Sequence, residues 1–277
     1  MKFWLIWGRG ISKTISRQGN NMNFVAQIGM LTLRFCQKTG HVSLFMFQAL
    51  CRGLTPPFYF RQIFKQIVEI GYYSLPVVGL TALFSGMVLA LQSYTGFSRF
   101  SAESSIPNVV VLSITRELGP VLAGLMVAGR MGASMAAEIG TMRVTEQIDA
   151  LITLSTNPFR YLIFPRLFAG LLVMPLLVLV ADIIGVFGGY IVSTYKLDFN
   201  PGIYMTNTLE FLQASDVISG LIKAAVFGFV ISLMGSYQGY YSKGGAQGVG
   251  AATTHAVVSA CILILILNYT LTALMFE

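Results

Sequence analysis

The sequence has few charged residues, few cysteines and few histidines for a chain of 277 residues. Only 10% of the residues are charged, 55% are hydrophobic, and the mean hydropathy is +0.71. Soluble domains usually contain about 25% charged residues, so this composition lies well outside their range. The shortage of charge therefore indicates a membrane protein.

The scarcity of cysteine and histidine argues against most reactive centres. These residues lie far apart and form no metal-binding motif, so we expect neither a disulfide nor a metal site; they are Cys36, Cys51, Cys261, His41 and His255. The segment GRGISKT (8–14) superficially resembles a phosphate-binding loop, but it lacks the glycine before the lysine and follows no expected strand. We therefore expect a non-enzymatic chain with no metal and no cofactor of its own.

Long apolar segments are abundant instead. Five of them are long enough to cross a bilayer, which takes about 20 residues of helix. We place these spans at residues 75–95, 108–137, 164–192, 217–238 and 252–276. The expected fold is an all-α integral membrane protein with five transmembrane helices, preceded by an N-terminal interfacial helix.

The basic residues outside the spans are distributed unequally. Thirteen Lys or Arg residues lie on one side of the membrane and two on the other. This bias predicts a cytoplasmic N-terminus and an exterior C-terminus. It also attributes the basic character of the chain to a cytoplasmic membrane surface rather than to nucleic-acid binding.

The region before the first span is amphipathic. In residues 58–73, five phenylalanine and isoleucine residues line one helical face, and Arg61, Lys65 and Glu69 lie on another. This pattern is typical of a helix that lies in the membrane interface. Residues 23–53 show a weaker form of it, and two prolines separate the segments. We therefore divide the chain into a basic arm (1–22), cytoplasmic interfacial helices (23–74) and a five-helix transmembrane domain (75–277).

The second span contains a strip of small residues. Within RELGPVLAGLMVAGRMGASMAAEIG (116–140), a glycine or alanine recurs every fourth residue, at Gly124, Ala128, Gly132, Ala136 and Gly140. Positions four apart share one helical face. Small residues on such a face let helix backbones approach closely in lipid, so we expect helix packing along this strip.

Ionisable residues interrupt the spans at Arg116, Glu117, Arg130, Asp182 and Lys223. A charge at this depth costs at least about 2.5 kcal/mol, so each should face protein or a wet cavity. The expected orientation places all except Arg130 in the outer half of the membrane, where their charges sum to zero. They form either an interhelical ion-pair network or a polar site for an amphiphile, and Asp182 could serve only to neutralise Lys223 or Arg116.

Arg116 and Glu117 are neighbours in sequence, but adjacent residues point about 100° apart on a helix and do not pair. Each therefore needs a partner on another helix or a polar ligand. Pro120 adds a second irregularity, because it lacks the backbone donor that would meet the carbonyl of Arg116.

The segment EIGTMRVTEQIDALITLSTN (138–157) joins the second and third spans on the cytoplasmic side. Its apolar residues follow a helical stripe at Val144, Ile148, Leu151 and Ile152. Such a helix either lies on the membrane or docks onto a partner, and the pattern alone does not separate these alternatives.

The run RELGPVLAGLMVAGRMGASMAAEIGTMRVTEQIDAL (116–151) closely resembles the signature of MlaE/YrbE-type permeases. Weaker similarity is found in GMVLALQSYTGF (86–97), FPRLFAG (164–170) and LTALMF (271–276), so the resemblance covers roughly residues 22–276. These permeases are membrane subunits of ABC transporters that maintain outer-membrane lipid asymmetry in Gram-negative bacteria. The resemblance implies a permease in the bacterial inner membrane that moves phospholipids between the inner and outer membranes.

The resemblance also implies partners and site residues. A homodimer would bind two cytoplasmic ATPase subunits that hold ATP and magnesium, a STAS-domain regulator, and a periplasmic hexamer of MCE-domain proteins. Phospholipid would occupy an outward-open cavity at the dimer centre, lined by Tyr94, Arg116, Glu117 and Lys223, with Asp182 as a further expected member. Segment 138–157 would be the coupling helix that contacts the ATPase, through Glu138, Arg143, Glu146 and Asp149.

The sequence departs from the family pattern at two places. Many members carry aspartate where this chain has Asn268, and residues 1–22 extend beyond the usual family start. Alternatives to the permease are a secondary transporter and a membrane scaffold for another lipophilic substrate. A secondary transporter would be expected to show an inverted repeat, but five spans do not divide into equal halves. A membrane-embedded lipid enzyme would need a catalytic constellation, and none is recognisable.

Overall fold

The computed structural model describes residues 24–56, 59–100 and 102–276, so the expected basic arm (1–22) lies outside the described residues. The chain divides into two compact units, residues 1–47 and 48–277. The first unit contains most of α2 (Phe24–Gly53), one helix of 30 residues in the region of the weaker amphipathic pattern. Our division of the chain at residues 22 and 74 stays a prediction.

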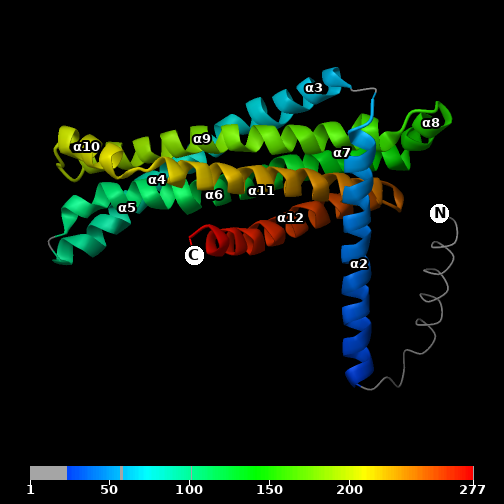
Figure 1. Cartoon of the computed structure of the whole chain (residues 1–277), viewed down its shortest axis with the longest axis horizontal. Helices are drawn as coiled ribbons and strands as arrows, with labels where there is room; N and C mark the ends of the chain where they lie inside the picture. Colours follow the sequence, from blue (N-terminus) through cyan, green and yellow to red (C-terminus); the bar gives the residue numbers. More distant parts are fainter. Residues whose placement is uncertain (1–23, 57–58, 101, 277) are drawn as a thin grey trace. The chain divides into compact units, whose positions relative to one another are not determined.

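The second unit is built from helices (Figure 1). They are α3 (Phe60–Gly71), α4 (Leu75–Phe97), α5 (Ile106–Ser113), α6 (Gly119–Val127), α7 (Ala133–Val144), α8 (Gln147–Thr153), α9 (Phe164–Tyr195), α10 (Pro201–Phe211), α11 (Ala214–Tyr240) and α12 (Gly245–Phe276). Short turns of 3₁₀- or π-helix join several of these into longer rods.

Within the described part of the chain, five helical rods are long and apolar enough to cross a membrane. They are Phe60–Phe100, Glu103–Val144, Phe159–Tyr195, Ala214–Tyr240 and Gly245–Met275. The expectation of an all-α membrane protein with five spans is thus confirmed, whereas the orientation of its termini stays a prediction. Every rod begins before the expected residue, because a helix continues beyond the apolar stretch that hydropathy detects.

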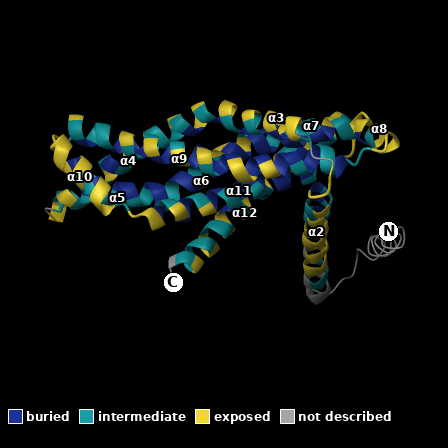
Figure 2. Cartoon of the chain, turned by 45° about the horizontal axis from the view of Figure 1, so that its top comes forward, coloured by how far each residue is buried: buried dark blue, intermediate teal, exposed yellow. Residues whose placement is uncertain are grey.

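Helices α9 and α11 form the centre of this unit. Helix α9 packs against α3, α4 and α11, and α11 packs in addition against α7 and α12. Figure 2 shows the buried residues concentrated along α9 and α11. Of the residues in the most apolar stretch of α11, 61% are buried, whereas only 11% are buried in the corresponding stretch of α12. The apolar face of α12 is therefore available to lipid or to another protein.

The amphipathic helix α3 is continuous with the first span, because only the 3₁₀ turn Tyr72–Ser74 separates it from α4. Its expected apolar face is divided. Ile63 and Ile70 are buried, on a helix that packs against α9, whereas Phe64 is exposed. Placement of α3 at a membrane surface stays a prediction.

The strip of small residues on the second span is buried and faces α11 and α12. A Cβ atom on Gly124 would lie 3.4 Å from the Phe227 ring, and one on Gly132 would lie 3.7 Å from Ile231. Tighter helix crossings occur elsewhere. A Cβ on Gly86 would lie 1.9 Å from the Gly185 carbonyl oxygen, so α4 and α9 can meet at this distance only if residue 86 has no side chain.

We predict that Gly86→Ala destabilises the protein by about 1–3 kcal/mol, because the added methyl group forces α4 away from α9. Gly129→Ala is the matched control, since a Cβ at this exposed helical position meets nothing within 4 Å. The control should be neutral or up to about 1 kcal/mol more stable, given the higher helix propensity of alanine. Thermal unfolding of both variants in detergent measures the difference, and equal melting temperatures would contradict the prediction.

Candidate functional site

The N-terminal half of the second span is distorted where it carries its charged pair. Residues Ile114–Leu118 form a π-helical turn that contains Arg116 and Glu117, and Pro120 follows it. Because Pro120 has no amide proton, the Arg116 carbonyl loses its usual helical partner. The Lys223 ammonium of α11 supplies a replacement and donates to that carbonyl oxygen at 2.9 Å.

The same lysine joins three helices through Glu117. Lys223 Nζ donates to Glu117 Oε1 at 2.7 Å and to Thr272 Oγ1 at 2.8 Å. The Thr272 hydroxyl lies 3.0 Å from Glu117 Oε1, and Asn268 Nδ2 donates to Glu117 Oε2 at 2.9 Å. Both carboxylate oxygens therefore have partners, and the second span is bound to α11 and α12.

Arg116 pairs with a residue that our sequence analysis missed. Its Nε donates to Asp216 Oδ1 at 2.8 Å, and its Nη2 donates to the same oxygen. Asp216 is 1% exposed and its Oδ2 accepts from the Gln213 backbone N–H at 3.2 Å, as part of a capping box at the start of α11. We began the fourth span at residue 217 and so overlooked it. The pattern of Gln213 and Asp216 three residues apart, just before an apolar run, was the available signal.

Asp182 does not join this cluster, so the expectation that it neutralises Lys223 or Arg116 is wrong. Asp216 and Glu117 fill that role. Asp182 is 6% exposed, its carboxylate makes no hydrogen bond among the described residues, and a Cβ on Gly119 would lie 1.9 Å from its Oδ1. The reason is its place on α9, on a face that packs against α4 and α6 rather than toward α12.

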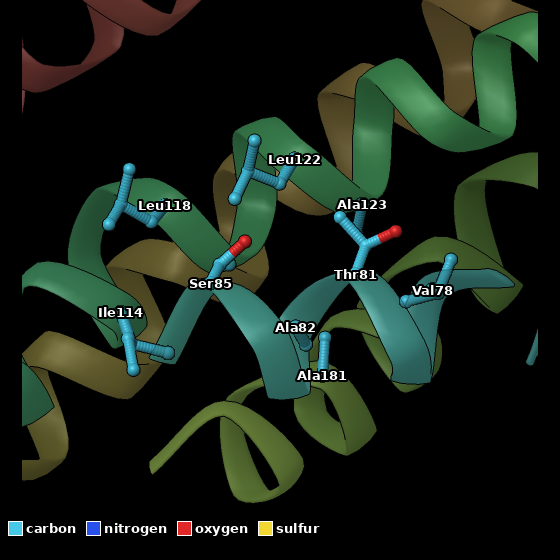
Figure 3. A pocket seen from close by; sticks show the side chains of 10 residues that line it. Val78, Thr81, Ala82, Ser85, Ile114, Leu118, Leu122, Ala123 and Ala181 are labelled. Carbon is cyan, nitrogen blue, oxygen red and sulfur yellow. The ribbon is translucent and has the colours of Figure 1, made fainter. Parts of the chain in front are cut away.

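The environment next to Asp182 is apolar. Figure 3 shows the adjoining cavity, which is lined by residues of α4, the π-turn, α6 and α9, with the hydroxyls of Thr81 and Ser85 as its polar side-chain groups. Thr81 Oγ1 already donates to the Val77 carbonyl oxygen at 2.7 Å. This small cavity is therefore suited to helix packing and offers little to a headgroup.

The four charges of the cluster Arg116, Glu117, Asp216 and Lys223 balance, but their exposure differs. The Lys223 and Asp216 side chains are 0% and 1% exposed, whereas Arg116 and Glu117 are 34% and 37% exposed. The buried pair fixes the positions of the other two. Arg116 and Glu117 are neighbours in sequence and each stays about one-third exposed, so one cation and one anion remain accessible at this level of the span.

Two other charged or polar residues from the sequence analysis lie apart from the cluster. Tyr94 packs edge-on against the Phe199 ring, with centroids 6.1 Å apart, and borders the buried group around Ile114. Arg130 lies on the second π-turn, Ala128–Gly132, and donates to Ser74 Oγ at 2.8 Å. It therefore contacts the junction of α3 and α4.

The expected coupling segment consists of the end of α7, a turn and the short helix α8. Glu146 adopts a left-handed conformation with φ 62° at the turn, and Arg143 Nη1 pairs with Asp149 Oδ1 at 2.9 Å on the surface. Glu138 instead pairs with the buried Arg166 at 2.7 Å. Ile148 of the apolar stripe is buried. The other stripe residues, Val144, Leu151 and Ile152, are therefore the ones that can contact a membrane or a partner.

The comparisons with known proteins show which family the chain belongs to. The sequence profile of the family Permease MlaE matches residues 63–274, which is most of the chain. The chain belongs to the MlaE permease family. It is thus an ABC transporter permease and a multi-pass membrane protein.

Members of the MlaE family from distant organisms are similar to this chain. A "Probable ABC transporter permease protein" of Rickettsia bellii is 62% identical over 256 residues, covering 92% of this chain and 99% of the relative. The "Intermembrane phospholipid transport system permease protein MlaE" of Haemophilus influenzae is 36% identical over 258 residues, covering 92% and 98%. "Protein TRIGALACTOSYLDIACYLGLYCEROL 1, chloroplastic" of Arabidopsis thaliana is 37% identical over 230 residues, covering 83% and 66%.

We predict that Lys223→Ala destabilises the permease by about 3–5 kcal/mol, because it leaves Glu117 and the Arg116 carbonyl without their shared partner. The double variant Lys223→Met with Glu117→Gln should recover most of this loss, since it removes both charges and keeps the volume. Thermal unfolding in detergent measures both effects. A double variant as unstable as Lys223→Ala would show that the ion pair is not the cause.

Proposed function

We propose that this MlaE-family permease transports phospholipid, and that the charge cluster is where it binds the headgroup. Arg116 and Glu117, each about one-third exposed, support this proposal, because they keep a cation and an anion accessible at neighbouring positions of an apolar span. A membrane lipid offers the matching chemistry of a charged headgroup on apolar chains. The name of the Haemophilus relative, which specifies intermembrane phospholipid transport, points in the same direction.

In this proposal the cluster serves both stability and binding. The buried residues Lys223 and Asp216 hold the second span to α11, which supports the ion-pair role. The side chains of Arg116 and Glu117 are 34% and 37% exposed, which supports the binding role. The sequence left open an interhelical ion-pair network and a polar site for an amphiphile. In this proposal the buried residues of the cluster serve the first role and the partly exposed residues serve the second.

The proposed assembly is a homodimer in the bacterial inner membrane with an outward-open lipid cavity at its centre. Tyr94 belongs to the proposed cavity wall, whereas Asp182 is placed in the packing of α9. An ABC permease requires an ATPase, and we propose that separate subunits bind ATP and magnesium so that this chain needs no cofactor. An MCE-domain hexamer and a STAS-domain regulator complete the proposal, which would maintain outer-membrane lipid asymmetry.

We propose further that the ATPase binds at the turn between α7 and α8. Glu146 and Asp149 are exposed there, and the left-handed residue at 146 ends the long rod of the second span. Arg143 holds Asp149 in place through its ion pair. Glu138 pairs with Arg166 through one carboxylate oxygen, so we assign it a role in holding α7 to α9 rather than in docking the ATPase.

The binding role is tested by the double variant Arg116→Gln with Asp216→Asn. This change removes both charges but keeps polar groups that can bond to each other, so the bundle should stay folded with a loss below about 2 kcal/mol. Phospholipid that co-purifies with the permease, counted by mass spectrometry, should fall severalfold. Thermal unfolding is measured on the same samples.

A matched control neutralises the surface pair instead, as Arg143→Gln with Asp149→Asn. Bound lipid should be unchanged in this control, because the pair lies on the surface at the α7–α8 turn, at the opposite end of the second rod from the cluster. Unchanged lipid in the Arg116 and Asp216 double variant, with or without a stability loss, would contradict a headgroup site at the cluster.

The coupling role predicts that Glu146→Lys weakens association with the ATPase by at least about tenfold, because a charge reversal at a complementary interface costs more than about 1 kcal/mol. Membrane insertion should be unaffected, since the residue is exposed at a turn. Glu210→Lys, at an exposed position on α10, is the control for adding a lysine. Co-purification and ATP hydrolysis measure the effect, and a Glu146→Lys complex that assembles and hydrolyses ATP normally would rule out docking through this residue.

A further inference from the structure

A second polar groove lies at the other end of the second span. Its walls are formed by α3 and the turn after it on one side, and by the second π-turn and α7 on the other. The groove is open to its surroundings and has a volume of about 770 Å³. Its charged wall residues are Lys65, Glu69, Arg130 and Glu138, and its apolar ones are Phe64, Val68 and Tyr73.

The guanidinium of Arg130 is held in position at this groove. Its Nη1 donates to Ser74 Oγ at 2.8 Å and reaches the Glu69 backbone carbonyl at 3.4 Å, and its centre lies 5.8 Å from the centroid of the Tyr73 ring. Its Nε and Nη2 donate no hydrogen bond to the described residues. Arg130 is therefore a fixed cation with two donors left for a ligand, and bidentate donation of this kind suits a phosphate.

The carboxylates of the groove make it neutral overall. Glu138 pairs with Arg166 Nη2 through Oε2 at 2.7 Å, yet its side chain is 40% exposed. Glu69 forms no ion pair with any described residue. Each wall carries one cation and one carboxylate, Lys65 with Glu69 on α3 and Arg130 with Glu138 on the other wall, and this favours a ligand that carries both signs of charge over a purely anionic one.

An apolar surface continues from the charged groups. Phe64, Val68 and Tyr73 are each more than half exposed, and Val77 and Leu80 extend this exposed surface along α4. A ligand that fits both parts has a zwitterionic head and long apolar chains. A membrane lipid has this form.

The groove is separate from the proposed outer site. Arg116 and Arg130 lie 14 residues apart on one continuous rod, which corresponds to about 21 Å along the helix axis. That distance spans most of the hydrocarbon core, about 30 Å thick, so the two sites lie at the levels of different leaflets. The distribution of Lys and Arg in the sequence predicts that this end of the second span faces the cytoplasm.

We propose that this groove is a second lipid site, which binds a phospholipid whose headgroup carries a phosphate and a primary ammonium. The phosphate binds Arg130 and Lys65, the ammonium binds Glu69 and Glu138, and an acyl chain follows Phe64 and Val68 toward α4. The lipid comes from the leaflet on the basic side of the membrane. This inference rests on the proposed function and adds to it a site and a headgroup preference for the opposite leaflet.

The experiment is photocrosslinking of the full-length permease, bound to its ATPase, in nanodiscs with equal amounts of phosphatidylethanolamine and phosphatidylglycerol. The photoreactive residue p-benzoylphenylalanine replaces Phe64 in the groove or, as a control for bulk lipid, the exposed Phe84 on α4. Mass spectrometry of the adducts gives the ratio of the two lipids at each position. We expect phosphatidylethanolamine to be enriched roughly threefold at position 64 relative to position 84, the effect of about one partly exposed ion pair.

Charge variants identify the groups responsible. Glu69→Gln should abolish the enrichment by removing an ammonium partner, and Lys65→Gln should lower the adduct yield of both lipids by removing a phosphate partner. Both residues are at least partly exposed, so the variants should fold. The matched controls Glu210→Gln and Arg61→Gln, at exposed positions outside the groove, should leave yield and ratio unchanged.

Three results would overturn the inference. They are equal lipid ratios at positions 64 and 84, an enrichment that survives Glu69→Gln, and adducts at position 64 with a second permease copy or with the ATPase instead of lipid. Each of these leaves the proposed function intact if phospholipid is still lost from the Arg116 and Asp216 double variant. If no variant at either site loses bound lipid, both proposals are rejected together.

Discussion

The Lys223 ammonium determines how the outer part of the bundle is built. A proline four residues after Arg116 leaves a backbone carbonyl unpaired inside the membrane, where no water replaces the missing donor. Lys223 meets that carbonyl and the Glu117 carboxylate with one group, and it is completely buried in doing so. The π-turn of the second span, α11 and α12 therefore meet at this one cation.

The side-chain amide of Asn268 also provides a partner for a charged group of the cluster. Asn268 donates a hydrogen bond to Glu117, whereas an ionised aspartate at this position would place a second carboxylate against the first. With asparagine, the cluster is neutral without taking up a proton. A chain with aspartate there would need another cation or a proton, so the residue at 268 sets the charge state of the whole site.

Apolar length was sufficient to predict the five spans, and the rarity of charge within them identified Arg116, Glu117 and Lys223. Neither signal shows which way a side chain points. Asp182 was therefore assigned to the wrong neighbours, and Asp216 was overlooked because a carboxylate at a helix start is common in any protein. The left-handed Glu146 and the close contact of Gly86 with Gly185 depend on tertiary packing and had no recognisable local pattern.

The two π-turns of the second span affect how its later side chains are oriented around the helix axis. Val144 lies 28 residues after Arg116 on this rod, or about 42 Å along the axis, and each π-turn accommodates one residue more than an α-helical turn. Conversion of either turn to α-helix would shift every later side chain by about 100° around the axis without breaking the rod. This helix carries the proposed headgroup cluster at one end and the α8 turn at the other. Conversion of one of its π-turns would therefore rotate one end about the helix axis relative to the other.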